Sequence, residues 1–197
     1  MAAKAIVVDL DGTIWDSYPL YAALIEELAG VPANQTEVDL HGGASIIRLL
    51  RNHRVSRARF VQLACERSAG LGLYEGVRST LEELHGRSVS LAVFTALPRD
   101  LAESLLISTG LDRYFTATVH AGNCRARKPS PAGIYRAMEV LGIEAAADVI
   151  YVGDRTVDSE TAQNASVSFA WARYGYQATP PRYVSVTLES FAQLIQP

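Results

Sequence analysis

Four short, uninterrupted apolar segments alternate with helical patterns along most of this chain. Most of these segments are rich in β-branched residues, and all are too short for a typical helix, so they predict strands buried on both faces, as in parallel sheets. Alternation of such strands with helices favours an α/β fold with a doubly wound parallel sheet. The predicted strands are residues 5–8, 89–94, 149–152 and 167–170, and the predicted helices are residues 77–84, 101–107, 131–141 and 157–165.

The segment of residues 17–72 interrupts this alternation. It contains three helical patterns separated by turn residues, and no convincing strand. We therefore predict a small helical subdomain inserted after the first strand, with residues 1–16 and 73–197 forming the core. The tail beyond residue 181 predicts one short strand and a closing helix over residues 188–195. The helical patterns of the insertion are residues 20–28, 44–50 and 58–68.

Charge and cysteine content exclude several classes of protein. A net charge of -3 without long runs of one sign is not typical of a nucleic-acid binder. Every apolar run is short and interrupted, which argues against a membrane span. Cys65 and Cys124 have no metal-site spacing and are too few for a disulfide framework, so we expect structural thiols in a reduced, cytoplasmic protein. The oligomeric state stays open.

Two aspartates follow the first predicted strand directly. Asp9 and Asp11 point the same way on an extended segment, and two nearby carboxylates need a cation or a shared proton. Gly12 allows a sharp turn that brings backbone amides close to a ligand, which makes it a candidate substrate-binding residue. The alternative is a strand that ends in an ordinary turn at Asp11 and Gly12.

Polar residues also end two other predicted strands. Thr95 ends the second strand, and Asp154 and Asp158 flank a turn after the third. Taken alone, Thr95 and Asp154 could each be a helix cap. Because ligands bind at the carboxyl ends of strands in such sheets, the set predicts a single site. Lys128 is one of only two lysines beside 16 arginines, so it invites a chemical explanation, although a surface lysine beside a proline turn is the alternative.

In order along the chain, the motifs DLDGT, FTA, RKP and GDRTVD resemble those of the haloacid dehalogenase-like hydrolase superfamily, most closely its phosphatases of the phosphoglycolate-phosphatase type. The resemblance covers nearly the whole chain. It implies a Rossmann-like core and identifies the insertion with the superfamily's helical cap. It also implies that Asp9 attacks phosphorus, that Asp11 is the general acid and base, that Thr95 binds a phosphoryl oxygen, and that Lys128 neutralises charge.

The same resemblance implies that Mg²⁺ is held by Asp9, the Asp11 carbonyl and Asp154, with Asp158 acting through water or orienting Lys128. The second motif continues with Ala96 where the family often has Asn or Ser, so only the Ala96 amide remains to bind substrate. In the inserted segment, Arg48 is a candidate for a second anionic group of the substrate. The loop of residues 171–176 resembles a loop of phosphoglycolate phosphatases and is either pocket lining or an aromatic plug.

The expected activity is Mg²⁺-dependent hydrolysis of a small phosphorylated metabolite through an aspartyl-phosphate. One alternative is a sugar phosphomutase of the same superfamily, which the absence of lysine from the insertion weakens. The other is a regulatory protein that keeps the phosphatase fold without its catalytic activity. Such a protein should have lost at least one of Asp9, Asp11, Lys128 or Asp154. All four residues are present. The sequence does not indicate which phosphomonoester is the substrate.

Overall fold

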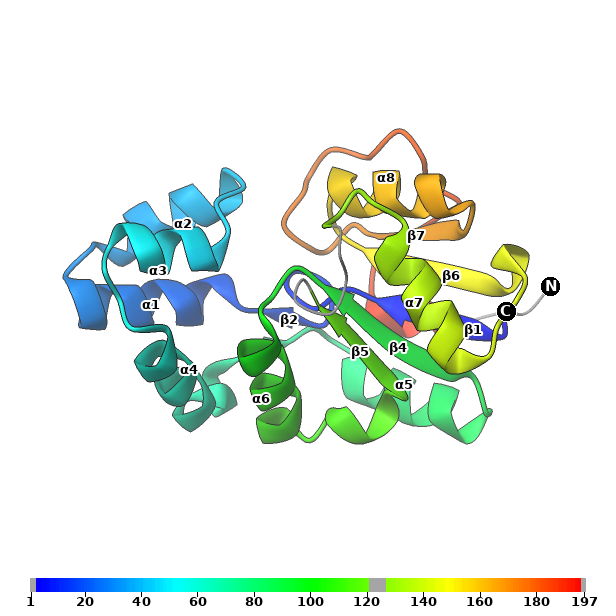
Figure 1. The fold of residues 1–197 in the computed structure, drawn as a ribbon, viewed down its shortest axis with the longest axis horizontal. Helices are drawn as coiled ribbons and strands as arrows, with labels where there is room; N and C mark the ends of the chain where they lie inside the picture. Colours follow the sequence, from blue (N-terminus) through cyan, green and yellow to red (C-terminus); the bar gives the residue numbers. More distant parts are fainter. Residues whose placement is uncertain (1–2, 121–126, 196–197) are drawn as a thin grey trace.

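The described part of the protein, residues 3–120 and 127–195 of a computed structural model, contains a six-stranded parallel sheet (Figure 1). The strand order is β5-β4-β1-β6-β7-β8. From β1 the chain adds β4 and β5 on one side and then β6, β7 and β8 on the other. The strand order therefore reverses at β1, which is the topological switch point of the sheet. This confirms the doubly wound α/β fold. The strands are β1 (Ala5–Val8), β4 (Ser90–Thr95), β5 (Ala117–His120), β6 (Val149–Gly153), β7 (Ser168–Ala172) and β8 (Val186–Leu188).

Helices cover both faces of the sheet. Side chains of β1 alternate between two apolar clusters, since Ile6 and Val8 pack into one and Ala5 and Val7 into the other. The first cluster includes residues of α5 (Val77–Gly86) and α6 (Arg99–Thr109), and the second includes residues of α7 (Ala132–Leu141) and α8 (Thr156–Ala165). Burial on both faces explains why these strands are uninterrupted apolar runs in the sequence.

Four further helices lie between two very short strands, β2 (Trp15–Asp16) and β3 (Gly72–Leu73), which pair antiparallel. In Figure 1 these helices stand to one side of the sheet, and α4 packs against α6. The two-stranded ribbon coincides with the predicted limits of the insertion, and the division into core and cap remains a prediction. The helices are α1 (Tyr18–Ala29), α2 (Ala33–His41), α3 (Ile46–Asn52) and α4 (Arg57–Glu66), followed by the 3-10 turn η1 (Ser68–Gly70).

Parts of the fold differ from the sequence predictions. The sheet has an edge strand, β5, and the insertion has a helix, α2, that were not predicted. The predicted closing helix over residues 188–195 is wrong in its start and type, because Leu188 ends β8 and only η4 (Phe191–Ile195) follows, as a 3-10 helix. Two other 3-10 turns are η2 (Asp112–Tyr114) and η3 (Ala146–Asp148).

The sequence predicts structural thiols and argues against a membrane-spanning segment. Cys65 is a partly buried free thiol, and Cys124 lies outside the described residues. In residues 3–120 and 127–195, the helices are too short or too polar to cross a membrane.

Candidate active site

Parallel pairing brings the predicted strand-end residues to one edge of the sheet. Val8 is in register with Val93 on β4 and with Val152 on β6. The next residues along the three strands are therefore neighbours, and they include Asp9 directly after β1. Thr95 is the last residue of β4, and Asp154 follows the last residue of β6. The site lies at the switch point, where ligands bind in sheets of this kind.

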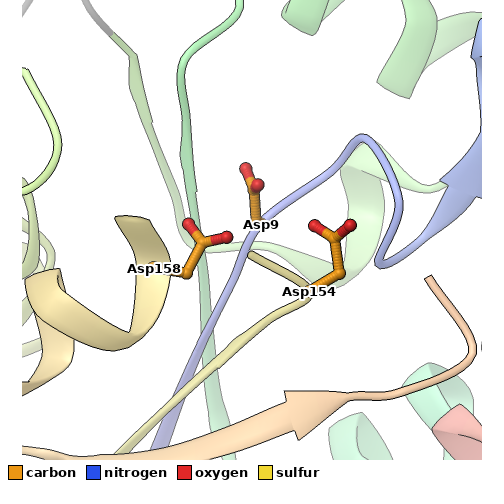
Figure 2. Close-up of side chains that lie close together, drawn as sticks. All are labelled: Asp9, Asp154 and Asp158. Atoms are coloured by element: carbon orange, nitrogen blue, oxygen red, sulfur yellow. The ribbon is translucent and has the colours of Figure 1, made fainter. Parts of the chain in front are cut away.

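Asp9, Asp154 and Asp158 form a buried carboxylate cluster (Figure 2). One oxygen of each residue lies within 4.8 Å of the others. Asp154 and Asp158 are fully buried, and Asp154 Oδ1 has no hydrogen-bond partner within the described structure. Burial raises the pKa of Asp9 to about 7, with Asp158 adding to the effect and Lys128 opposing it. Burial also raises the pKa of Asp154, and Asp158 and Asp9 add to it.

The cluster suits a divalent cation. Grouped ionised carboxylates are unfavourable in a buried site unless a cation compensates them, and carboxylate oxygens are the ligands of hard cations such as Mg²⁺. The unpartnered Asp154 Oδ1 is a free ligand atom in this group. The residues present therefore fit a divalent metal.

Lys128 completes the charge balance of this cluster. Its Nζ lies 2.9 Å from Asp9 Oδ1 and 2.7 Å from Asp158 Oδ1, and its side chain is only 6% exposed. Burial opposes the charge on Lys128, but Asp158 and Asp9 keep its pKa above the ordinary value. Asp158 also accepts a hydrogen bond from the Tyr151 hydroxyl at 2.9 Å. The geometry therefore holds Lys128 against Asp9 as a cation, with Asp158 orienting it.

Asp11 is held by two side chains that were not predicted as its partners. Its Oδ1 accepts hydrogen bonds from the indole Nε1 of Trp15 at 2.9 Å and from the hydroxyl of Tyr21 at 3.2 Å. Burial raises the pKa of Asp11 above its ordinary value, although these hydrogen bonds act in the opposite direction. A carboxyl group with a raised pKa can carry the proton that a general acid needs near neutral pH.

Thr95 and Ala96 follow β4 at the same edge. Thr95 is buried, and its Oγ1 accepts the backbone N–H of Leu97 at 3.1 Å. Because a hydroxyl has one proton to donate, this bond leaves the Thr95 O–H as a donor for an oxygen in the site. Ala96 is exposed and has no polar side chain, so the group it offers to a substrate is its backbone amide.

A cavity of about 220 Å³ lies between this sheet edge and the inserted helices. It is smaller than the 300–1,000 Å³ typical of sites for drug-sized ligands, so it suits a small molecule. Asp9, Asp11, Thr95, Ala96 and Lys128 all line it. The described lining also includes Asp158, Arg155, Tyr18, Tyr21, Leu40, residues 43–46, Leu97 and Val157.

Two predicted substrate-binding residues lie elsewhere. Arg48 is exposed on α3 and is not among the described residues that line the cavity. Gly12, also absent from that lining, packs beneath the site with a positive φ of 77°. A Cβ at Gly12 would lie 2.4 Å from Asp154 Oδ2, so this position requires glycine for close packing. Among the described residues, the arginine that lines the cavity is Arg155, which was not predicted as a site residue although it lies inside the GDRTVD motif.

The loop of residues 171–176 packs against Asp154 and holds it in position. The Trp171 indole donates to the backbone carbonyl of Asp154 at 3.1 Å, and the backbone N–H of Tyr176 donates to Asp154 Oδ2 at 2.9 Å. A Cβ at Gly175 would lie 2.3 Å from the Gly12 carbonyl oxygen, so the two segments are in close contact. Because the described cavity lining does not include this loop, it buttresses Asp154 rather than forming the pocket wall.

This chain is similar in sequence and fold to several known proteins. The phosphoglycolate phosphatase of Pectobacterium atrosepticum is 29% identical to this chain, over 98% of this chain and 92% of the relative. A solved HAD-superfamily hydrolase of subfamily IA from Geobacter sulfurreducens is 26% identical, with a TM-score of 0.76 over 98% of this chain and 95% of that one. CbbY from Rhodobacter sphaeroides, solved with phosphate, has a TM-score of 0.79 over 98% and 96% of the two chains; at 21% identity it shows the fold alone.

The family comparison covers most of the sheet and all of the inserted helices. Residues 6–172 match the model of the haloacid dehalogenase-like hydrolases. That range contains all four motifs on which the sequence resemblance depends, from Asp9 to Asp158. The chain belongs to the haloacid dehalogenase-like hydrolase family.

Proposed function

We propose that this protein is a Mg²⁺-dependent phosphatase that hydrolyses a small phosphomonoester through a phosphorylated Asp9. The observation that carries the proposal is the position of Lys128 Nζ, 2.9 Å from Asp9 Oδ1, with both side chains nearly buried in the lining of the cavity. A lysine in contact with a nucleophilic carboxylate can neutralise both that carboxylate and an incoming phosphoryl group. Relatives named phosphoglycolate phosphatase, at modest identity, support the same reaction class.

The reaction divides into two displacements at phosphorus. In the first, an Asp9 carboxylate oxygen forms a bond to phosphorus while the bond to the leaving oxygen breaks, and Asp11 gives its proton to that oxygen. In the second, a water oxygen forms a bond to phosphorus, Asp11 takes the water proton, and the bond to Asp9 breaks. The products are an alcohol and inorganic phosphate, and Asp9 and Asp11 return to their starting states.

The other site residues position the transferring group. Lys128 compensates the negative charge of Asp9 and of the phosphoryl oxygens, while the Thr95 hydroxyl and the Ala96 amide donate hydrogen bonds to those oxygens. Asp9, Asp154 and the Asp11 carbonyl would hold the Mg²⁺, with Asp158 acting through water or orienting Lys128. When bound, a divalent cation supplies positive charge that favours approach of the phosphoryl group to Asp9. Trp15 and Tyr21 keep the Asp11 carboxyl group in one orientation.

The cavity limits the size of the substrate. Its volume of about 220 Å³ favours a small phosphorylated metabolite over a nucleotide.

The phosphomutase alternative requires the phosphoryl group to return to a sugar hydroxyl instead of passing to water. The regulatory alternative is disfavoured because Asp9, Asp11, Lys128 and Asp154 are all present and are grouped in one site. Location in the cytoplasm remains a prediction.

Phosphate release from a broad panel of phosphorylated metabolites tests the proposal. Release should require Mg²⁺, should be abolished by excess chelator, and should be fastest for the smallest phosphomonoesters. Sugar phosphates should yield inorganic phosphate rather than an isomeric sugar phosphate, which product analysis by NMR would distinguish. Full turnover in chelator, or isomerisation without phosphate release, would contradict the proposal.

Mg²⁺ binding should stabilise the protein more at about pH 8 than at about pH 6. The pKa of Asp9 is raised to about 7 in the folded protein. Between the ordinary pKa of Asp and about 7, Asp9 is therefore protonated in the folded protein and ionised in the unfolded chain. Without metal, the free energy of unfolding falls as pH rises through this window. Because the metal binds the ionised carboxylates, its stabilising effect grows over the same window. Thermal denaturation with and without Mg²⁺ measures this effect. Asp154→Asn should lose most of the increment, and an equal increment at both pH values would count against the cluster as the metal site.

A further inference from the structure

Arg155 connects the sheet edge to the inserted helices across the cavity. Its Nη1 donates to the hydroxyl of Tyr18 on α1 at 3.3 Å, and its Nη2 donates to the backbone carbonyl of His41, the last residue of α2, at 3.0 Å. Both acceptors are uncharged. Within the described residues, the guanidinium forms no ion pair with a carboxylate, although it lines the same cavity as Asp9 and Lys128.

The surroundings of Arg155 fix the position of its side chain. Its backbone N–H donates to Asp158 Oδ2 at 3.1 Å, at the first turn of α8. The Tyr18 ring stacks on the Tyr176 ring at a centroid distance of 3.7 Å, and the His41 ring packs edge-on against both. This platform holds the acceptors of the guanidinium in place. Arg155 is therefore held in the wall of the cavity by Tyr18 and His41, within the same small volume that Asp9 and Lys128 line.

We propose that Arg155 selects phosphomonoesters with a second anionic group, a carboxylate or a second phosphoryl group. This inference rests on the proposed function, because it takes the phosphoryl end of the substrate to lie against Asp9, Lys128 and Thr95. In a cavity of about 220 Å³, the other end of such a substrate reaches the wall that Arg155 contributes. An anionic oxygen would replace the neutral acceptors Tyr18 and His41, and charge-assisted hydrogen bonds to a guanidinium are shorter and stronger than those to neutral groups.

Arg48 was the sequence-based candidate for the same task. It is exposed on α3 and is absent from the described cavity lining, whereas Arg155 is half-buried and lines it. The two arginines therefore give opposite expectations for mutants, which allows a direct comparison.

Paired substrates test the assignment. Phosphoglycolate carries a carboxylate, 2-hydroxyethyl phosphate has a hydroxyl in its place, and ethylene glycol bisphosphate carries a second phosphoryl group. In the wild type, kcat/KM should be higher for one or both anionic substrates than for the hydroxyl compound, and the higher one identifies the anion. Arg155→Met should reduce this preference by about 10- to 100-fold, the contribution of hydrogen bonds to charged groups. Arg155→Lys should retain part of it, because it keeps the charge but not the fork.

Two other arginines serve as comparisons. Arg48→Met should leave the substrate preference unchanged if Arg155 is the selecting residue. Arg136→Met, which removes an exposed residue paired with Glu139 on α7, controls for loss of a cation as such. Equal losses on all three substrates in Arg155→Met would overturn the inference, and so would a loss of preference in Arg48→Met alone.

Binding to an inactive variant separates this inference from the proposed function. Calorimetric titration of Asp9→Asn with the same three compounds should show tighter binding of an anionic one, and the Asp9→Asn/Arg155→Met double variant should lose that difference. Absence of phosphate release by the wild type would contradict the proposed function while leaving the binding result to decide on Arg155. An unchanged affinity difference in the double variant would contradict the role of Arg155 alone.

Discussion

Asp9→Asn is expected to reduce phosphate release by about 10⁴- to 10⁶-fold, the range that removal of a catalytic nucleophile costs in enzymes with covalent intermediates. The carboxamide has nearly the shape of the carboxylate but cannot attack phosphorus. The variant should remain folded, because Asn at this position removes a buried negative charge from a crowded carboxylate cluster. Steady-state kinetics on the best substrate of the panel, with circular dichroism to confirm folding, measures the effect.

A matched control for this variant is Asp112→Asn. Asp112 is exposed in η2 and is not among the cavity-lining residues that the structure describes, so its replacement should leave kcat/KM unchanged. Activity of Asp9→Asn within tenfold of the wild type, about 1.4 kcal/mol of transition-state stabilisation, would remove Asp9 from the role of nucleophile. A similar loss in Asp112→Asn would point to a general effect of the substitution rather than to chemistry at Asp9.

Lys128→Arg should lose activity almost as severely as Lys128→Ala, although it preserves the charge. The ammonium lies between two carboxylate oxygens at 2.9 and 2.7 Å, and it packs over the rings of Phe94 and Tyr151 at 5.2 and 5.3 Å. A guanidinium is a wide planar fork that does not fit this space without displacing Asp9 or the substrate. Misplacement of a reacting group by about 1 Å can cost about 10²-fold in rate.

The chain supplies its own control, because Lys4 is its other lysine. Lys4 is 68% exposed and pairs with Asp148 at 2.9 Å, so Lys4→Arg should retain full activity. Steady-state kinetics of both variants, with thermal denaturation to confirm folding, makes the comparison. A folded Lys128→Arg protein with near-wild-type kcat/KM would show that the site needs only a positive charge at this position.

The sheet and the carboxylate cluster could be predicted because their signals are local. Strands buried on both faces are continuous apolar runs, and the residues that end them must meet at one edge in a parallel sheet. The strand ends therefore predict that Asp9, Thr95 and Asp154 lie together. Helix α7 was also recognisable, since Pro131 precedes it and Gly142 ends it in the left-handed conformation at a φ of 67°.

Other features could not be predicted, because long-range contacts determine them. Strand β5 is short, and within the described residues it lies at the sheet edge and pairs with β4 alone, so its apolar pattern is weak. Helix α2 is mostly polar and buries only Thr36 and Leu40, which leaves little periodic signal. The closing segment failed as a helix because Leu188 pairs with Ala172 in the sheet.

Within the site, the residues missed by sequence reasoning act across large separations in the chain. Arg155 reaches acceptors 137 and 114 residues away, and Tyr176 supports Asp154 through a backbone amide that has no side-chain signature. Asp11 is different, because Trp15 lies only four residues ahead of it in the chain. That contact depends on the turn at residues 10–14, whose geometry a bare motif does not reveal.

Trapping of the phosphorylated enzyme tests the central claim most directly. Wild-type protein should be mixed with Mg²⁺ and substrate, quenched in acid, and reduced with borohydride, which converts an acyl phosphate to an alcohol. Peptide mass spectrometry should then find homoserine in place of Asp9, and this product should be absent from Asp9→Asn and from samples quenched without substrate. Modification at another aspartate, or phosphate recovered on a serine or histidine, would contradict nucleophilic attack by Asp9.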